Sequence, residues 1–264
     1  MKLMGVDVGF SNMRPTTGIA CLDEEWLFLA RVGTTWAKRE AVIPHGFRPS
    51  IIALDGPLLP EGASELTRRE CESLFVRAPF HNRCKPGLSH TGSGLALRRA
   101  TADACRQFSQ TLPQSAEPRD KFVHRNGSIV EAFPNAFLGV LTPEPDLMAA
   151  PKFKRGKRFD WLYSRIVASG LLESELSPLL PLPKNVWERL RSEPDHELRA
   201  ALICLLTAAL AQIGVAEIVG EETGGWFWLP PRHLWEPWAR DGLRRASARF
   251  PWAMTARSPA APIG

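Results

Sequence analysis

Met4-Gly5-Val6-Asp7-Val8-Gly9-Phe10-Ser11-Asn12, close to the start of the chain, is the stretch that decides the fold. Residues 3–8 are mostly apolar and β-prone, and Gly9 favours a turn directly after them. Asp7 therefore faces a buried or half-buried surface, where an unpaired carboxylate is costly. We expect a metal ion, a basic partner or a phosphate-binding arrangement to neutralise it. The alternative is that Asp7 caps the turn over residues 9–12.

The composition is that of a globular protein with a mild preference for anionic partners. The chain has 264 residues, of which 44% are hydrophobic and 23% charged, so it can bury a substantial core. Its net charge is +5, and basic proteins of this kind often bind nucleic acid. The five cysteines form no CxxC pair, so we expect neither zinc ligation nor a disulfide framework.

No membrane segment or signal peptide is expected. The chain enters a predicted strand at once, without a charged and then apolar leader. Residues 200–219 are apolar, but Gln212, Gly214 and Glu217 interrupt them before the length of about 18 to 20 residues that a membrane span needs. We therefore expect a cytoplasmic protein with no membrane partner.

The hydrophobic pattern predicts one α/β domain over residues 1–231, with a five-stranded mixed sheet flanked by helices. Strands are expected at 3–8, 17–22 and 26–32 as an antiparallel meander, then at 50–55 and 127–134, with a C-terminal hairpin over 216–231. The fourth strand ends in Asp55-Gly56-Pro57, where open α/β sheets place ligands. Residues 232–264 form a C-terminal extension that is either partly ordered or unstructured.

An insertion of helices and a long loop follows the fourth strand, over residues 61–118. Helices are predicted at 65–75 and 95–112, with a loop at 77–94. Its basic residues either form a phosphate-contacting rim beside Asp55 or lie on a solvated face. The candidates for nucleic-acid contact are Arg68, Arg69, Arg83 and Lys85.

A second basic segment lies between two predicted helices, at 135–140 and 159–169. In Pro151-Lys-Phe-Lys-Arg-Gly-Lys-Arg-Phe-Asp160, five of the seven positions from 152 to 158 are basic. Basic runs with aromatic residues suit nucleic-acid backbones, although an exposed loop without a partner has the same composition. The candidate contacts here are Lys152, Lys154, Arg155, Lys157 and Arg158.

A late helix carries two more acids. Ser192-Glu-Pro-Asp195 predicts the start of a helix that runs through Leu210, with Pro194 in its first turn. Asp195 shares a stripe with apolar residues, and Glu197 lies on the opposite, equally apolar side. Either acid could face the sheet, and we favour Asp195.

The acids recur where ligands of divalent cations are expected. Asp7 and Asp55 lie in or end predicted strands, Glu131 lies inside the fifth strand, and Asp195 or Glu197 opens the late helix. Such a set could hold two Mg²⁺ or Mn²⁺ ions against a phosphodiester, one placing the attacking hydroxide and the other stabilising the leaving oxygen. The set predicts a metal-dependent nuclease, with Asp7, Asp55, Glu131, Asp195 and Glu197 as candidate catalytic residues.

Several stretches of the chain together carry a family resemblance. They are Gly5-Val6-Asp7-Val8-Gly9, Ala53-Leu54-Asp55-Gly56-Pro57, Arg68-Arg-Glu-Cys-Glu72, Arg83-Cys-Lys-Pro-Gly87, Val130-Glu-Ala-Phe-Pro134, Asp195-His-Glu-Leu-Arg-Ala-Ala-Leu202 with Leu206-Thr-Ala208, and residues 224–231. Through them the chain resembles the ribonuclease H-like superfamily, and within it the family catalogued as domain of unknown function 429, predicted nucleases. The resemblance covers roughly residues 3–231 and implies a ribonuclease H-like fold and a metal-dependent nuclease with Asp7, Asp55, Glu131 and Asp195 or Glu197 as ligands.

Two other function classes fit part of the pattern. A non-catalytic nucleic-acid-binding protein on a nuclease scaffold is favoured by Arg199-Ala200, because related resolvase-type helices often carry a second acid at this point. An actin-like or sugar-kinase-type phosphotransferase shares the sheet order and an Asp-x-Gly start. No second glycine-rich phosphate loop follows in the sequence, which argues against the phosphotransferase.

Overall fold

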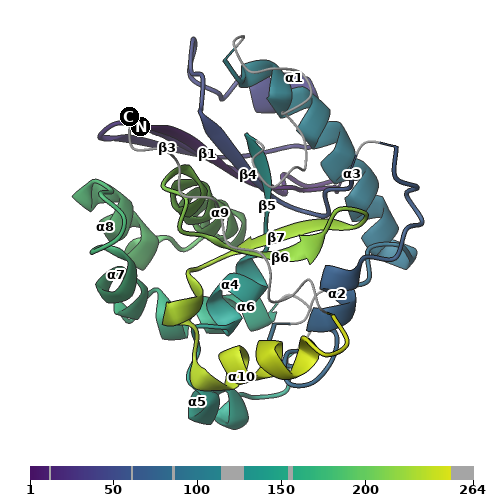
Figure 1. Cartoon of the computed structure of the whole chain (residues 1–264). Helices are drawn as coiled ribbons and strands as arrows, with labels where there is room; N and C mark the ends of the chain where they lie inside the picture. The colour runs from purple at the N-terminus through teal and green to yellow at the C-terminus, as the bar shows by residue number, and fades with distance from the viewer. Residues whose placement is uncertain (12, 61, 85–86, 114–127, 154–156, 251–264) are drawn as a thin grey trace.

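Seven strands form one mixed sheet at the centre of the molecule (Figure 1). The computed structural model describes every residue except 12, 61, 85–86, 114–127, 154–156 and 251–264. Across the sheet the strands follow the order β3-β2-β1-β4-β5-β7-β6. Their bounds are β1 Lys2–Asp7, β2 Thr17–Asp23, β3 Trp26–Val32, β4 Ile51–Asp55, β5 Ile129–Ala132, β6 Glu217–Glu221 and β7 Gly225–Leu229.

The predicted α/β class is confirmed, but the expected count of five strands is wrong. The meander β1-β2-β3 is antiparallel, while β1, β4 and β5 run parallel. The C-terminal hairpin is present as β6 and β7, and β7 pairs in parallel with β5. The hairpin therefore extends the main sheet. The backbone of β7 pairs with the backbone groups at the edge of β5 that would otherwise be exposed, and β7 is itself buried throughout.

Helices flank the sheet on both faces. The expected insertion helices are present as α2 and α3. The pattern did not predict α5, α7, α8 or α10. The helix bounds are α1 Trp36–Glu40, α2 Glu70–Phe75, α3 Gly92–Phe108, α4 Pro134–Gly139, α5 Glu144–Ala149, α6 Lys157–Ile166, α7 Leu171–Leu176, α8 Lys184–Ser192, α9 His196–Gln212 and α10 Pro237–Ala246, with short 3-10 turns at Ser109–Thr111 and Arg232–Leu234.

Helix α9 packs directly across β1, β2 and β4 and is buried along nearly all its length, as the apolar pattern predicted. Two glycines allow this close approach. A Cβ atom on Gly5 would overlap the backbone of Ala201 and Leu205, and one on Gly18 would overlap the backbone of Glu197. The helix therefore runs antiparallel to β1, with its first turn beside the end of β1 that carries Asp7.

The start of α9 differs from the sequence expectation by a few residues. The helix begins at His196, and Asp195 is its N-cap residue, whose carboxylate accepts hydrogen bonds from the N–H groups of Glu197 and Leu198. Pro194 thus precedes the helix and does not lie in its first turn. An N-cap aspartate satisfies amide donors that the helix itself leaves unpaired, which fixes the boundary here.

Two apolar clusters lie on opposite faces of the sheet. The larger joins the α9 face to α2, α4, α6, α7, α8 and α10, and the smaller lies under α3, with Phe47, Leu58 and Phe108. Residues after β7 belong to the larger cluster, since Trp235, Trp238 and Leu243 are buried in it. None of the described helices is both long and apolar enough to cross a membrane.

Candidate active site

Asp7 and Asp55 lie side by side on one face of the sheet. Each is the last residue of its strand, and the parallel register of β1 and β4 pairs them directly. Residues paired in this way point to the same face. That face is covered by α9, because Gly5, two residues before Asp7, contacts this helix. The structure therefore places these two carboxylates next to each other on the α9 face of the sheet.

Among the described residues, no basic side chain pairs with the Asp7 or Asp55 carboxylate. Both residues are half-buried, and within the described part of the chain neither side chain takes part in an ion pair or a side-chain hydrogen bond. Burial raises the pKa of Asp7 well above its usual range, and the charges of Asp55, Glu197 and Asp195 raise it further. Burial also raises the pKa of Asp55 to about 7, with a contribution from Glu131. Protonation or a bound cation would relieve this repulsion.

The two acids at the start of α9 share one arginine. Arg31 of β3 places Nη1 2.7 Å from Asp195 Oδ2 and Nη2 3.4 Å from Glu197 Oε1. Burial opposes ionisation of Asp195, but the N–H of Leu198 and the Arg31 guanidinium hold its pKa below its usual range. Both carboxylate oxygens of Asp195 are therefore engaged, Oδ1 by the N–H groups of the helix and Oδ2 by Arg31. Glu197 has the longer contact, so it is the helix acid that can turn towards Asp7 more readily, contrary to our preference for Asp195.

Glu131 lies on the opposite face of the sheet, which contradicts the expectation that it joins Asp7. The β4–β5 register pairs it with Leu54, and Leu54 and Asp55 point to opposite faces. Its carboxylate accepts two hydrogen bonds from Arg69, at 2.8 and 2.6 Å, and one from the Leu58 N–H at 2.8 Å. Burial raises the pKa of Glu131 to about 7 while Arg69 opposes the shift. This residue already has a permanent counter-charge.

Arg69 is therefore not a nucleic-acid contact. It is completely buried, and it also binds Glu72 at 3.1 Å and the Gly224 carbonyl. Glu72 in turn accepts hydrogen bonds from Ser89. Composition alone did not distinguish this arginine from its exposed neighbours. The Arg-Glu-Cys-Glu pattern, with an acid three residues after Arg69, was the one local signal for a buried ion pair.

A small cavity of about 90 Å³ lies between the two acid groups. It opens at the ends of β4 and β5, and Asp55, Glu72 and Glu131 line it. Asp55 thus borders both the α9 face and the arginine-neutralised group. The first group, Asp7 with Asp55, lacks a cation among the described residues, and the second, Glu72 with Glu131, has one.

The predicted basic contacts differ in their surroundings. Arg68 donates to Ser73 Oγ, while Lys152 and Lys157 are exposed on the segment before α6 and at its start. Arg83 and Arg158 are half-buried. Lys85, Lys154 and Arg155 lie outside the described residues.

The start of α6 lies against the start of α9. Asp160 Oδ1 is 2.8 Å from His196 Nδ1 and 3.5 Å from Arg199 Nη1. The ring of Phe159 meets the His196 imidazole edge to face. The first turn of α6 is therefore next to the first turn of α9, which carries Glu197.

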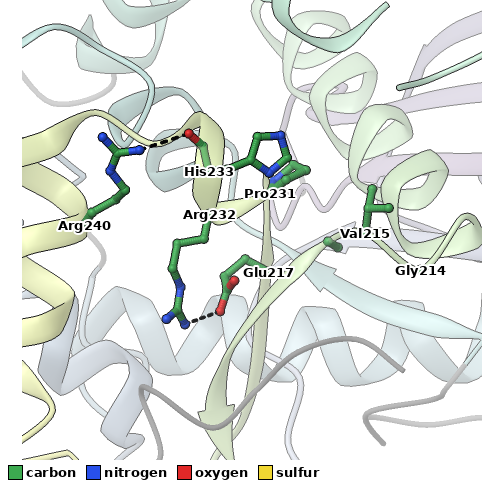
Figure 2. A pocket seen from close by; sticks show the side chains of 8 residues that line it. Gly214, Val215, Glu217, Pro231, Arg232, His233 and Arg240 are labelled. Carbon is green, nitrogen blue, oxygen red and sulfur yellow. Dashed lines mark hydrogen bonds and ion pairs between the residues drawn. The ribbon is translucent and has the colours of Figure 1, made fainter. Parts of the chain in front are cut away.

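A larger cavity lies elsewhere and contains none of the predicted acids. It has a volume of about 510 Å³ and is lined by Glu217, Arg232, His233 and Arg240, at the turn between α9 and β6 and after β7 (Figure 2). Arg232 is paired with Glu217, and Arg240 donates to the His233 carbonyl. Cavity size thus does not identify the site that the acids indicate.

The metal donors are not gathered into a closed cluster. Among the described residues, no three His, Cys, Asp or Glu side chains converge closely enough to hold an ion. The five cysteines are buried with free thiols.

No protein-family model, no curated protein and no solved structure matches the chain.

Proposed function

We propose that the protein is a metal-dependent nuclease of the ribonuclease H-like type. The observation that carries this proposal is the register-paired couple Asp7 and Asp55, two half-buried carboxylates without a counter-charge among the described residues. Such a pair is unfavourable in the absence of a cation. A divalent ion with oxygen ligands is the partner that this chemistry fits best.

The strand arrangement supports the proposal. A β3-β2-β1-β4-β5 order, with an antiparallel meander followed by two strands parallel to β1, is the arrangement that the resemblance to this superfamily implies. An acid ends β1, another ends β4, and a late helix brings Glu197 towards them. Membership of the family of unknown function 429 and action on a cytoplasmic nucleic acid are parts of the same proposal.

Three side chains would hold the metal. Asp7 and Asp55 are in place, and Glu197 would complete the set by leaving Arg31, whose contact with it is long and partly exposed. Bound Mg²⁺ or Mn²⁺ would supply a nucleophilic hydroxide and stabilise the leaving oxygen. Asp195 keeps the first turn of α9 in position as its N-cap. Glu131 has no part in this metal site, because its carboxylate is held by Arg69.

A second candidate function follows from Glu131. Arg69 binds both oxygens of the Glu131 carboxylate, so Glu131 is not free to bind a metal ion. Fewer carboxylates are then left for a metal site than the sequence predicts. A nucleic-acid-binding protein that has lost hydrolysis would show the same arrangement. This alternative predicts binding of nucleic acid without cleavage.

The test is a nuclease assay with Mg²⁺ or Mn²⁺ on single-stranded, duplex and branched substrates. We expect the wild type to cleave at least one substrate, and Asp7→Asn and Asp55→Asn to abolish cleavage. Asp241→Asn is the matched control, because Asp241 lies on α10, half-exposed and paired with Arg244. Binding without cleavage by the wild type would favour the second candidate. Cleavage that survives in Asp7→Asn would refute the assigned site.

A further inference from the structure

Arg83 and Arg158 come together from distant parts of the chain. Cys84 and the Arg83 carbonyl pack against Gly139 at the end of α4, and α4 packs against α6, which carries Arg158 in its first turn. Both guanidinium groups act on the buried Cys84 thiol, because each opposes the upward shift of its pKa that burial causes. Arg83 therefore lies beside the contact between α4 and α6, the helix that carries Arg158 in its first turn.

Each guanidinium lies over an aromatic ring. The Arg83 Cζ atom is 4.5 Å from the centre of the Trp238 ring, and the Arg158 Cζ atom is 5.1 Å from that of Phe153. Stacking of this kind fixes the guanidinium plane but uses none of its N–H groups. The N–H groups of both arginines therefore stay available for other hydrogen bonds.

Two of these donors have no protein partner. Arg83 Nη1 and Arg158 Nε are buried and make no hydrogen bond in the described structure. Arg83 Nη2 donates to Glu144 Oε1 at 2.6 Å, but the Glu144 side chain is 52% exposed. Arg158 has no ion-pair partner among the described residues. Buried donors without acceptors are costly and call for a ligand or water that satisfies them.

We propose that Arg83 and Arg158 form a binding site for a phosphate group. Each guanidinium keeps one buried donor without a partner among the described residues, and phosphate oxygens are the acceptors that arginine binds in this way. One half-exposed carboxylate, Glu144, leaves the pair with a net positive charge. The first turn of α6 adds the positive end of a helix dipole beside Arg158.

Arg158 shares the first turn of α6 with the residue that contacts α9. Arg158 is two residues before Asp160, which contacts His196 at the start of α9. The following residue, Glu197, is the helix acid whose charge acts on Asp7 more strongly. Phosphate binding at the arginines does not rest on the proposed hydrolysis, since the unpaired donors bind phosphate whether or not the acids cleave a bond.

The test measures two ligands with the full-length chain in the presence of EDTA. Inorganic phosphate at millimolar concentration should raise the melting temperature, and a fluorescent single-stranded oligonucleotide should bind by anisotropy. Arg83→Gln and Arg158→Gln should each weaken binding by about tenfold, which is what the removal of one charge-assisted hydrogen bond causes. The log–log slope of oligonucleotide affinity against salt should become shallower by about 0.7 for each phosphate that a variant no longer neutralises.

Matched controls separate this site from general charge effects. Arg165→Gln removes the same charge from the same helix, but Arg165 is ion-paired with Asp146, so binding should be unchanged. Arg83→Lys and Arg158→Lys keep the charge and remove the fork, and they serve as the test if a Gln variant fails to fold. Weaker binding of inorganic phosphate alone identifies free phosphate as the ligand, and weaker binding of the oligonucleotide identifies a nucleic-acid backbone.

The proposal is overturned if the Gln and Lys variants bind both ligands as the wild type does, or if Arg165→Gln weakens binding as much as they do. Phosphate binding and cleavage can be tested separately, so failure of the phosphate-site proposal is distinguishable from failure of the proposed nuclease function. Asp7→Asn should keep phosphate binding while losing cleavage. A wild type that binds phosphate through the arginines but never cleaves would refute only the nuclease assignment.

Discussion

Replacing Asp55 by Asn should stabilise the metal-free protein at neutral and alkaline pH. The folded-state pKa of Asp55 is raised from 3.8 to about 7 because burial and Glu131 disfavour its charge. In the unfolded chain the same carboxyl ionises near its ordinary value. The folded state therefore binds this proton more tightly, and stability falls as the pH rises from about 4 to about 7. Above pH 7 the folded state carries the full cost of the ionised Asp55 carboxylate, and below pH 4 this cost is absent.

The size of the effect follows from the shift. A difference of about 3 pKa units corresponds to about 4 kcal/mol at 1.36 kcal/mol per unit. Asp55 is only half-buried, so solvent screening reduces this to about 1–2 kcal/mol. For a domain of this size, that is a rise in melting temperature of about 2–8 °C. The rise should be present at pH 8 and vanish at pH 4.

The assay is thermal unfolding of wild type and Asp55→Asn between pH 4 and pH 8 in EDTA, with Asp241→Asn as a control. Asp241 is half-exposed and paired with Arg244, so its replacement should give no comparable pH-dependent gain. Mg²⁺ should then stabilise the wild type more than Asp55→Asn, because a cation bound only to the folded state raises its stability. An Asp55→Asn variant that is less stable than wild type at pH 8, or whose difference is the same at every pH, would refute this account of the acid pair.

Two further changes test the neighbouring arginines. Arg69→Met should destabilise the fold by about 3–5 kcal/mol in urea unfolding, because it leaves Glu131 buried without its cation, while Glu72 keeps Arg98 at 3.9 Å. A decrease below about 1 kcal/mol would show that the buried Glu131 carboxylate does not need Arg69. Arg31→Gln should change metal-free stability by less than about 1 kcal/mol, because Arg31 is partly exposed. The same variant should lower the Mg²⁺ concentration for half-maximal thermal stabilisation, since Glu197 is released, and a higher requirement would mean that Arg31 positions the acids.

The acid-bearing strands were predictable because their signals are local. Residues 3–8 and 50–55 are largely apolar runs that carry an Asp at or near their end, and both became central parallel strands. The buried character of α9 also followed from its composition. The exact start of α9 depends on a hydrogen bond of one side chain. The first turn of α9 begins after Asp195 because this side chain is directed back to cap the helix, which the apolar pattern does not encode.

Three features could not be predicted, because they depend on contacts between distant parts of the chain. Glu131 faces away from Asp7 because β5 pairs with β4 in a register that aligns it with Leu54. A shift of one residue would reverse the face. The burial of Arg69 depends on a partner 62 residues away. The strand count likewise depended on β7 finding the free edge of β5, which the hairpin pattern alone does not reveal.

The contrast between the two acid groups gives the strongest argument about where the chemistry lies. Glu72 and Glu131 each have an arginine at hydrogen-bonding distance, so their charges serve the stability of the α2–β5 contact. Asp7 and Asp55 are also costly to ionise but have no such partner among the described residues. Among the described residues, buried arginine neutralises Glu72 and Glu131 but not Asp7 and Asp55, and this difference supports the proposal that a cation binds at Asp7 and Asp55. Glu197, whose side chain can leave its long contact with Arg31, lies on the helix that covers the face carrying Asp7 and Asp55.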